Sequence, residues 1–482
     1  MQLDRRGFLI GLGAGAGWLA AHGLGVRGFG APPEPASFAE TLRAFGASLT
    51  DEQRRHLVFP ADHPSRQITN TLAVVRGPHL GTLLSPAQQM QLRRLFDAAL
   101  SERGREAFAG TVAVEGRFEG CVVAIYGEPT HGDAQVAISG GHLLVRGGEP
   151  APASNAALGG GVAYGHQIGN GKWRVAGNSF AYHGDALNRF MRTLDAEQRD
   201  AAILPAPPHE LVLQVQGAGA SFPGVAIGSL GDASRDEARR LLETIFSCYP
   251  VQRRRDALSC IDANGGADAL HVAVYASHGF YADMKPWDAL DPAERERRGP
   301  PYWQIWRIEG PGTIVHFKGS PHVHAYLSVV RDPARANVGE SLGEITTPLE
   351  GEPMRRLLEA ALRRATGEAL AFHGAEIPGR FCPGLVTTGL AWSLDPYANH
   401  VVVATVGGRD MAFSLRTRLA AQGLRIVSGG LYRIATTDYF GRQDEFGEPQ
   451  AIEASPLLLR DALVAHLRAG GLDTLPAAPE PT

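Results

Sequence analysis

The sequence predicts an α+β protein: a mainly antiparallel-sheet N-terminal domain with packed helices, followed by a smaller α+β C-terminal domain. Apolar residues alternate along short segments, helical patterns stand between groups of these segments, and the composition changes near Val338. With 482 residues and 44% hydrophobic side chains, the chain is long enough for two or three cores. We place a signal at 1–31 and domains at 36–340 and 345–472.

Helical patterns in the first domain have clear start and stop signals. The pattern from Phe38 to Leu57 is interrupted near Ser48, and Ser85 followed by Pro86 predicts the start of a helix that continues to about Arg103. Two further helices are expected at Asp185–Leu194 and Ser234–Phe246. Alternation predicts extended segments at Thr111–Glu115, Cys121–Tyr126, Ala134–Ile138, His142–Val145, Leu211–Val215 and Leu270–Tyr275.

A glycine-rich passage runs from Leu158 to Gly171. It is too long for a tight turn, and it lacks the Lys-Ser/Thr ending of a phosphate-binding loop. We interpret it as a wall of a cleft rather than as a nucleotide cradle.

The most informative stretch is Pro301–Val329. Its pattern predicts two strands, Trp303–Ile308 and Thr313–Phe317, and a third strand that begins with His322-Val323-His324. Alternate residues of a strand share a face, so both imidazoles point the same way, about 6–7 Å apart along the backbone. They supply two of the three ligands that a metal face needs.

Imidazole clusters of this kind suit a single divalent transition metal: zinc, copper, iron or manganese. Glu309 is the candidate for a carboxylate ligand or a general base. The alternative is that these histidines only form hydrogen bonds with their neighbours. Trp303 and Trp306 are aromatic neighbours expected at a substrate site. The candidate metal ligands are His142, His316, His322 and His324, with His166, His183 and His278 in reserve.

The N-terminus has the pattern of a targeting signal. Arg5 and Arg6 precede a weakly apolar, glycine-rich run from Gly11 to Ala21, which is too short to form a stable membrane span. This resembles a twin-arginine export signal and implies the twin-arginine export machinery as a partner and a periplasmic location. That route carries folded proteins, which suits a metalloprotein. Cys248 and Cys260 would then either form a disulfide or remain buried and reduced.

Charge argues against nucleic acid as a partner. The 46 basic and 50 acidic residues give a net charge of −4, and there is no long block of one sign. The short run Glu294–Arg298 is expected to be solvated surface. We therefore expect a small-molecule substrate.

Three motifs carry a family resemblance: Ser139–Leu143, Trp306–Pro311 with Val315–Gly319, and Pro321–Tyr326. Together with the glycine-rich passage they resemble the bacterial family known as domain of unknown function 3500, over roughly residues 40–335. Members commonly carry two adjacent histidines where this chain has His142-Leu143. The resemblance implies a shared fold and supplies no reaction.

The C-terminal half begins with a helical stripe from Met354 to Ala365, and Ser455-Pro456 is expected to cap a last helix, Leu457–Arg468. The segments Thr387–Trp392 and Tyr432–Tyr439 resemble the C-terminal, substrate-binding domain of the 5'-nucleotidase family. There, aromatic rings enclose the nucleoside base and the domain contacts the ribose. The resemblance implies substrate contacts, here from Phe381, Tyr439, Phe440, Asp444 and Phe446.

The metallophosphoesterase motifs of that family, Asp-x-His and Gly-Asn-His-Asp/Glu, do not occur in this chain. Its phosphatase chemistry therefore does not carry over. The leading hypothesis is an exported metal-dependent hydrolase in which Glu309 activates water and the second domain helps to bind a nucleotide or another phosphoester. The alternatives are a periplasmic protein that binds copper or another transition metal for redox work, and a binding protein without catalysis.

Overall fold

The fold is described from a computed structural model. It describes residues 37–72, 74–115, 118–131, 134–148, 155–166, 179–281, 285–298, 301–319, 322–375, 377 and 379–472. The proposed export signal lies outside these residues, as does most of the glycine-rich passage after His166. Residues Phe38–Thr482 form one compact unit. No helix within the described residues is both long and apolar enough to cross a membrane.

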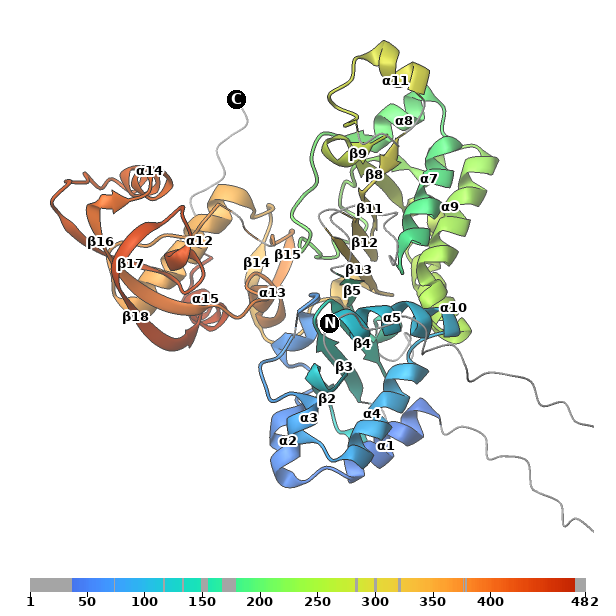
Figure 1. Ribbon diagram of the computed structural model, residues 1–482, viewed down its shortest axis with the longest axis horizontal. Helices are drawn as coiled ribbons and strands as arrows, with labels where there is room; N and C mark the ends of the chain where they lie inside the picture. Colours follow the sequence, from blue (N-terminus) through green and yellow to red (C-terminus); the bar gives the residue numbers. More distant parts are fainter. Residues whose placement is uncertain are drawn as a thin grey trace, which may run out of the picture. The chain divides into compact units, whose positions relative to one another are not determined.

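An eleven-stranded sheet organises the chain from Val58 to Val329 (Figure 1). Its strands pair in the order β1-β2-β3-β4-β5-β13-β12-β11-β8-β6, and β7 also pairs with β8. All pairs are antiparallel except β1 with β2 and β6 with β8, so the α+β prediction is confirmed. The strands are β1 Val58–Phe59, β2 Val122–Tyr126, β3 Gln135–Gly140, β4 Leu143–Gly147, β5 Val162–His166, β6 Ile203–Leu204, β7 Val225–Ala226, β8 His271–Tyr275, β11 Ile305–Gly310, β12 Thr313–Lys318 and β13 Val323–Val329.

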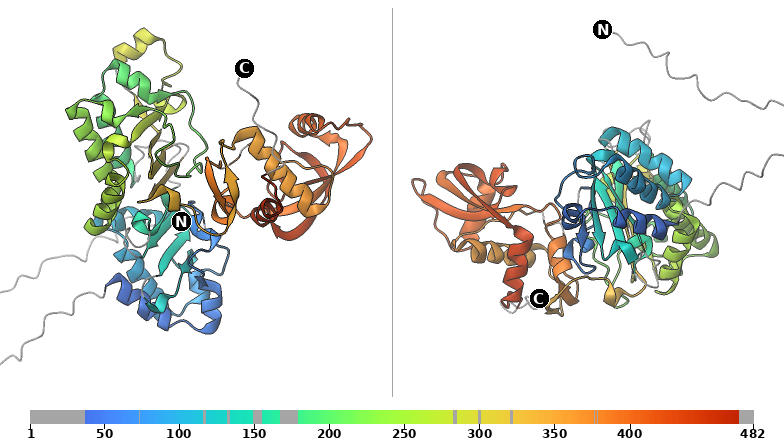
Figure 2. Two further views of the ribbon diagram at one scale, coloured as in Figure 1. Left: turned by 180° about the vertical axis from the view of Figure 1, so that it is seen from behind. Right: turned by 90° about the horizontal axis from the view of Figure 1, so that it is seen from below.

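Helices cover one face of this sheet and form its main hydrophobic core. Helices α9 and α10 lie alongside the strands in both further views (Figure 2). Helix α4 begins as the sequence predicts, because the Ser85 side chain accepts a hydrogen bond from the backbone N–H of Gln88 and Pro86 takes the first helical position. The helices are α1 Phe38–Ala47, α2 Asp51–Leu57, α3 Leu80–Leu83, α4 Pro86–Ala98, α5 Glu102–Glu115, α7 Ala181–Arg192, α8 Ala196–Ala202, α9 Asp232–Ile245 and α10 Val251–Asp262.

The opposite face of the sheet carries a second, smaller core and a row of polar side chains. Leu211 and Leu213 belong to the segment between β6 and β7, and they pack with Tyr326 of β13 against this face. Beside them Arg307 donates a hydrogen bond to the carbonyl of Val212. The segment therefore covers the polar face without adding a strand, and the extended element expected at Leu211–Val215 is not part of the sheet.

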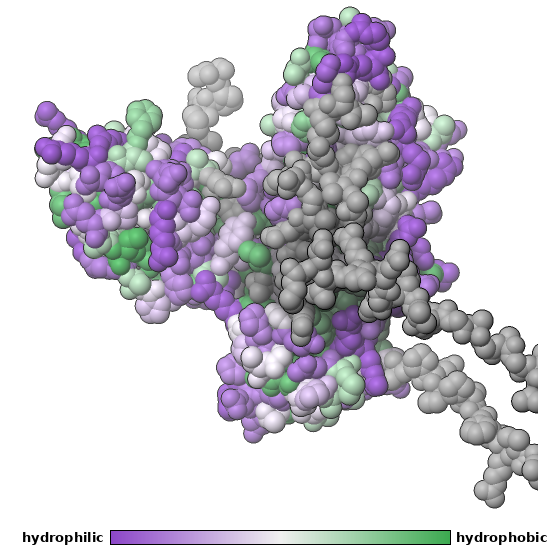
Figure 3. Space-filling view, in the orientation of Figure 1, coloured by the Kyte–Doolittle hydropathy of each residue, from purple (hydrophilic) through white to green (hydrophobic). Residues whose placement is uncertain are grey.

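Helix α11, Pro292–Arg298, has no buried residue, and its Arg295 and Arg298 lie over the rings of Trp287 and Tyr281 at the edge of the main core. Its side chains are exposed or half-buried, and the surface around it is strongly hydrophilic in Figure 3. The solvated surface expected for Glu294–Arg298 is confirmed. Nearby, the short strands β9 (Gly279–Phe280) and β10 (Tyr302–Trp303) form a pair of their own.

The C-terminal half is built on a three-stranded antiparallel sheet of order β17-β16-β18. Helices α12 and α15 pack together against it around the buried side chains of Leu358 and Leu463. A second pair of strands, β14 and β15, leads into α13. The elements are β14 Ser341–Ile345, α12 Gly351–Thr366, β15 Gly384–Thr387, α13 Thr388–Ser393, β16 His400–Met411, α14 Phe413–Ala421, β17 Leu431–Thr437, β18 Gly447–Leu458 and α15 Leu459–Arg468.

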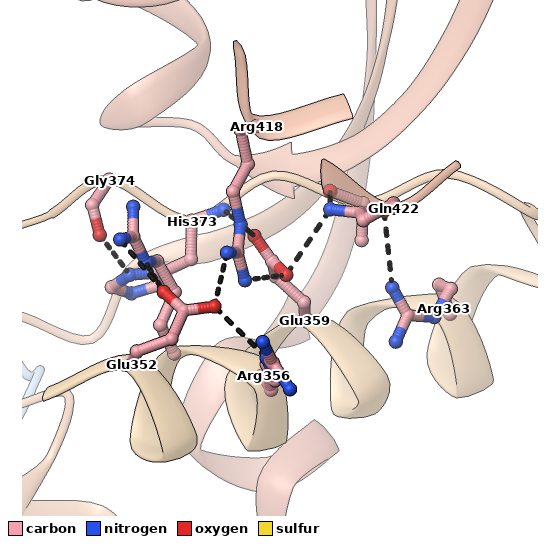
Figure 4. A network of polar contacts seen from close by, with 10 residues as sticks. Glu352, Arg356, Glu359, Arg363, His373, Gly374, Arg418 and Gln422 are labelled. Carbon is pink, nitrogen blue, oxygen red and sulfur yellow. Dashed lines mark hydrogen bonds and ion pairs between the residues drawn. The ribbon is translucent and has the colours of Figure 1, made fainter. Parts of the chain in front are cut away.

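A buried ion-pair network ties α14 to α12 (Figure 4). Arg418 donates to both carboxylate oxygens of Glu359, at 2.7 and 2.5 Å, and also to Glu352. Gln422 donates to Glu359 at 3.3 Å, and the backbone N–H of His373 does the same. The Arg418 guanidinium compensates the buried Glu359 carboxylate, the partly exposed Glu352 also pairs with Arg355 and Arg356, and the two helices are fixed to one another.

Two local predictions were wrong. Thr111–Glu115 alternates like a strand, yet it forms the last part of α5. Ser455 and Pro456 do not cap a helix, because β18 runs through them to Leu458 and α15 starts only at Leu459.

Candidate metal centre

Two neighbouring strands bring the candidate histidines together. His324 lies in β13 opposite Gly165 of β5, and the N–H of Gly165 donates to the carbonyl of His142 at 2.9 Å. A Cβ atom at position 165 would stand 1.8 Å from the carbonyl oxygen of Val323, so only glycine permits this close approach. Gly165 thus places the β3–β4 turn, which carries His142, beside the start of β13.

Three imidazoles form the cluster. One ring nitrogen from each of His142, His322 and His324 lies within 4.8 Å of the other two. The ring centroids are 4.9 Å apart for His142 and His322, 5.0 Å for His142 and His324, and 4.5 Å for His322 and His324. Across a tetrahedral zinc ion such nitrogens stand about 3.3 Å apart, so small side-chain rotations bring the three to ligand distance. His142 and His324 are buried and His322 is half-buried.

Glu210 fixes the orientation of one imidazole. Its carboxylate lies 2.9 Å from Nδ1 of His324 and 3.0 Å from Nζ of Lys318. Burial by itself raises the pKa of Glu210, but the hydrogen bonds and positive charges of His324 and Lys318 outweigh burial and lower it to about 2. A carboxylate only accepts, so Nδ1 of His324 carries a proton, and in the neutral imidazole Nε2 then has the lone pair. Glu210 was not among the residues singled out from the sequence.

In the neutral form of His324, the lone pair on Nε2 is available to a ligand. This atom is buried, and it has no hydrogen-bond partner among the described residues. Burial lowers the pKa of His322 to about 4, with further contributions from His324 and His142, which repel a second proton when they are themselves protonated, and from the Lys318 ammonium. His322 is therefore neutral at physiological pH, which is the form of histidine that binds metals.

Two other residues predicted for this site lie elsewhere. His316 is opposite Tyr326 in the sheet, two pairs further along than His324, and it is not one of the three clustered imidazoles. Glu309 is opposite Ile314, four residues along β12 from the Lys318–His324 pair, or about 13 Å at strand spacing. Its near neighbour is Arg307, at 3.3 Å. This register separates Glu309 from the imidazoles and removes the basis for it as their general base.

Most of the aromatic residues expected at a substrate site are core residues. Trp306 stacks on Phe317 with ring centroids 5.2 Å apart, and Trp303 packs on Trp287. Both face the helices, because Trp306 alternates along β11 with Arg307, which faces the polar side. Phe381 and Phe446 are also fully buried, in the cores of the C-terminal half. The sequence shows that these residues are aromatic, but it does not show whether their rings face a hydrophobic core or a substrate site.

Tyr439 and Phe440 do border a cavity. It measures about 350 Å³, and its lining also includes Asp395, Tyr397 and His209. Tyr439 is about half exposed, while Phe440 is buried. Asp444 is exposed and does not line it. Because His209 directly precedes Glu210, one chain segment contributes to both the aromatic cavity and the imidazole cluster.

The four cysteines are all free and buried. Burial raises the pKa of Cys248 to about 11, and its Sγ lies 2.7 Å from the hydroxyl of Tyr182. Of the two alternatives for Cys248 and Cys260, the structure has the buried, reduced one.

Comparison with known proteins gives one family match. A family model described as "Protein of unknown function (DUF3500)" matches residues 34–279. No curated protein matches the chain. Solved structures with some similarity include a 5'-nucleotidase precursor from Thermus thermophilus and a Staphylococcus aureus protein assigned as a 5'-nucleotidase, solved with alpha-ketoglutarate.

Both structural similarities are distant. The Thermus match has 12% identity and a TM-score of 0.25, and covers 40% of this chain and 55% of the other. The Staphylococcus match has 10% identity and a TM-score of 0.22, and covers 61% of this chain and 66% of the other. The chain thus spans about half to two thirds of the length of these proteins. The site has to be interpreted from its own side chains.

Proposed function

The chain belongs to the DUF3500 family, and we propose that it is a metal-dependent hydrolase whose single metal ion is held by His142, His322 and His324. The observation that carries the proposal is the state of His324. One ring nitrogen is held by the Glu210 carboxylate, and the other is buried, unpartnered among the described residues and directed to a cluster of imidazoles. A carboxylate behind a histidine is the usual outer support of a metal ligand.

The ligand set suits catalysis better than a structural role. Three protein ligands leave one tetrahedral position free, whereas structural zinc sites use four. A divalent metal there would polarise a substrate oxygen and lower the pKa of a bound water. Glu210 holds His324 in the ligand tautomer, and the Lys318 ammonium, 3.0 Å from Glu210, offers a positive charge to an anionic substrate. The half-buried His322 is the side of the cluster open to solvent.

A phosphoester, and a nucleotide in particular, is the substrate class that we propose to test first. The support is the segment His209-Glu210, which joins the imidazole cluster to the cavity bordered by Tyr439 and Phe440. Flat aromatic rings at such a cavity suit a nucleobase, with about 1–3 kcal/mol per stacked base. Lys318 suits the phosphate.

Export is the second part of the proposal. Arg5, Arg6 and the glycine-rich run after them support passage through the twin-arginine machinery to the periplasm. A fusion of residues 1–31 to a reporter that is active only after export tests this. Replacing both arginines by lysine should abolish reporter activity, and unchanged activity would contradict the twin-arginine route.

The test of the metal centre is elemental analysis of the purified full chain. We expect about one zinc, manganese or iron per wild-type chain and its loss in His324→Ala, while His56→Ala, a substitution of an exposed histidine on α2, retains it. The same proteins are then assayed with bis(p-nitrophenyl) phosphate and with nucleoside monophosphates, where activity should follow metal content.

Three outcomes would overturn the proposal in different ways. Absence of metal from wild type, even after incubation with each ion, would remove the metal centre. Stoichiometric copper without hydrolysis would favour the redox alternative. Retention of metal in His324→Ala would place the ion elsewhere.

A further inference from the structure

A second cavity lies on the polar face of the large sheet, at the opposite end of β13 from the imidazoles. It measures about 210 Å³ and is bordered by Ser328, by Leu211 and Leu213 of the covering segment, and by α13 and the loop before β15. His324 and Ser328 are four residues apart in β13, or about 13 Å. This cavity is therefore separate from the candidate metal centre, and the inference below does not rest on the proposed hydrolase activity.

We propose that this cavity is a binding site for a small oxyanion, such as a phosphate or carboxylate group. Three arginines, Arg66, Arg335 and Arg380, line it, and no aspartate or glutamate does. The remaining polar lining consists of hydroxyl and amide groups, including Thr69 and Gln67. A lining with positive charge and hydrogen-bond donors, and without carboxylates, is complementary to an anion.

Neighbouring carboxylates compensate these arginines only weakly, and Asp62 acts on Arg66 from beyond ion-pair distance. Within the described part of the chain, neither Arg66 nor Arg335 forms an ion pair. Arg66 instead donates to the side-chain oxygen of Gln135 and to the carbonyl of Ala61, both at 2.7 Å. Arg380 has one long ion-pair contact, 3.8 Å to the exposed Glu350, and a hydrogen bond with the Cys382 side chain, while its Nε is buried without a hydrogen-bond partner among the described residues. A ligand anion would supply the missing acceptors.

A fourth guanidinium stands directly behind the cavity wall. Arg146 is 1% exposed, and it donates to the carbonyls of Ile68 and Gly161, two residues that line the cavity. Its Nη1 is buried and has no partner among the described residues. Burial lowers the pKa of Arg66 and of Arg146. Tyr126 opposes this shift in both groups, while the charge of Arg66 adds to it in Arg146. Two like charges so placed are costly unless an anion lies near them.

Two glycines shape the wall. A Cβ atom at Gly161 would come within 2.0 Å of Thr69 Oγ1, and one at Gly160, where φ is +119°, would lie 3.1 Å from Cδ of Arg146. Glycine at both positions lets the backbone approach these side chains closely. The glycine-rich passage thus does form a wall, in the one part that the structure describes.

The volume limits the size of the ligand. Sites for drug-sized ligands usually measure about 300–1,000 Å³, so a cavity of about 210 Å³ suits a free oxyanion or the charged end of a larger molecule. Phosphate and a short dicarboxylate share the required chemistry. The experiment therefore includes both, as inorganic phosphate and as malonate.

Thermal unfolding and isothermal titration of the full chain test the site, at constant ionic strength and with chelator present so that a metal ion cannot bind the anion. We expect phosphate, malonate or both to raise the unfolding temperature of the wild type. Arg335→Gln and Arg380→Gln should each weaken binding at least tenfold. Arg239→Gln, a substitution of an exposed arginine on α9 that pairs only with Asp236 within the described residues, should leave binding unchanged.

The two ligands separate the possible sources. A response to phosphate alone assigns the site to phosphate-bearing molecules, and a response to malonate alone assigns it to carboxylates. The proposal is overturned if neither ligand binds, or if Arg335→Gln and Arg380→Gln bind as tightly as Arg239→Gln. Because chelator is present throughout, these results are independent of whether the imidazoles hold a metal.

Discussion

At the scale of single residues, the state of one imidazole depends on one carboxylate. Glu210 accepts from Nδ1 of His324 and leaves Nε2 to a ligand. Replacing Glu210 by glutamine removes the preference for a proton on Nδ1. The glutamine amide can also donate to Nδ1, which favours the tautomer with the proton on Nε2.

Glu210→Gln should therefore weaken zinc binding by about 10–100-fold, which is typical of the loss of an outer carboxylate. Competition with a chromophoric chelator at fixed pH measures the change. Glu448→Gln, a substitution of an exposed residue in β18, is the matched control and should bind zinc as the wild type does. Equal zinc affinity of the two variants would show that Glu210 does not support the ligand.

The sequence predicted the His322 and His324 pair but not Glu210. Strand alternation places two histidines of one strand on one face, and this requires only local information. Glu210 is 114 residues away from His324 and lies in a segment that forms no strand, so no periodicity pointed to it. Glu309 was selected because it is near in sequence, and the register of β11 with β12 then placed it far along the sheet.

At the scale of elements, the side chains of β11 alternate between the two faces of the sheet. Trp306 and Ile308 enter the main core, while Arg307 and Glu309 point to the polar face. The alternation predicted the strand correctly. Which face would be covered by helices depended on the arrangement of the whole sheet, and the tryptophans were therefore assigned to a substrate site in error.

Trp306→Ala should consequently lower the free energy of unfolding by about 3–5 kcal/mol, as expected for removing a large buried ring. Zinc stoichiometry of the folded variant should stay at the wild-type value. Urea unfolding gives the first quantity and elemental analysis the second. Phe413→Ala is the control, because that ring is 84% exposed and its loss should change stability little. A variant of full stability that fails to bind substrate would restore Trp306 to the substrate site.

Local propensity misled at α5 for a related reason. Thr111–Glu115 contains two valines in alternation, which favours a strand. In the structure it continues a helix that packs on β5 and the core, and the buried Thr111 donates to the carbonyl of Gly165. The packing of this helix against β5 and the core outweighed the weak preference of its valines for a strand. The glycine-rich passage gave the opposite error. We expected no strand there, but its residues Val162–His166 form a central strand that the glycine content did not predict.

At the scale of the whole molecule, both halves contain buried neutral histidines. His183 lies in the main core with Nδ1 3.3 Å from the Tyr164 hydroxyl, and His373 lies in the C-terminal half between Glu359 and Phe440. Burial, with a smaller contribution from the charge of Arg103, lowers the pKa of His183 to about 3. Burial likewise lowers the pKa of His373 to about 4.

These shifts predict a loss of stability in acid. Between pH 6.5 and the lowered pKa values, the unfolded chain binds protons at these histidines and the folded chain does not, so the free energy of unfolding decreases as pH falls. Each such histidine contributes a slope of about 1.4 kcal/mol per pH unit within its window. The window for His183 extends from about pH 6.5 to about pH 3.

His183→Gln should remove one of these contributions. Urea unfolding of the chelator-treated protein between pH 6 and pH 4 should show a slope smaller by about 1.4 kcal/mol per pH unit than that of the wild type, even though the variant is less stable at pH 7. His56→Gln, a substitution of an exposed residue, should keep the wild-type slope. If the slopes of all three proteins agree, His183 is protonated equally in the folded and unfolded chains, and the acid sensitivity of the molecule must arise from other groups.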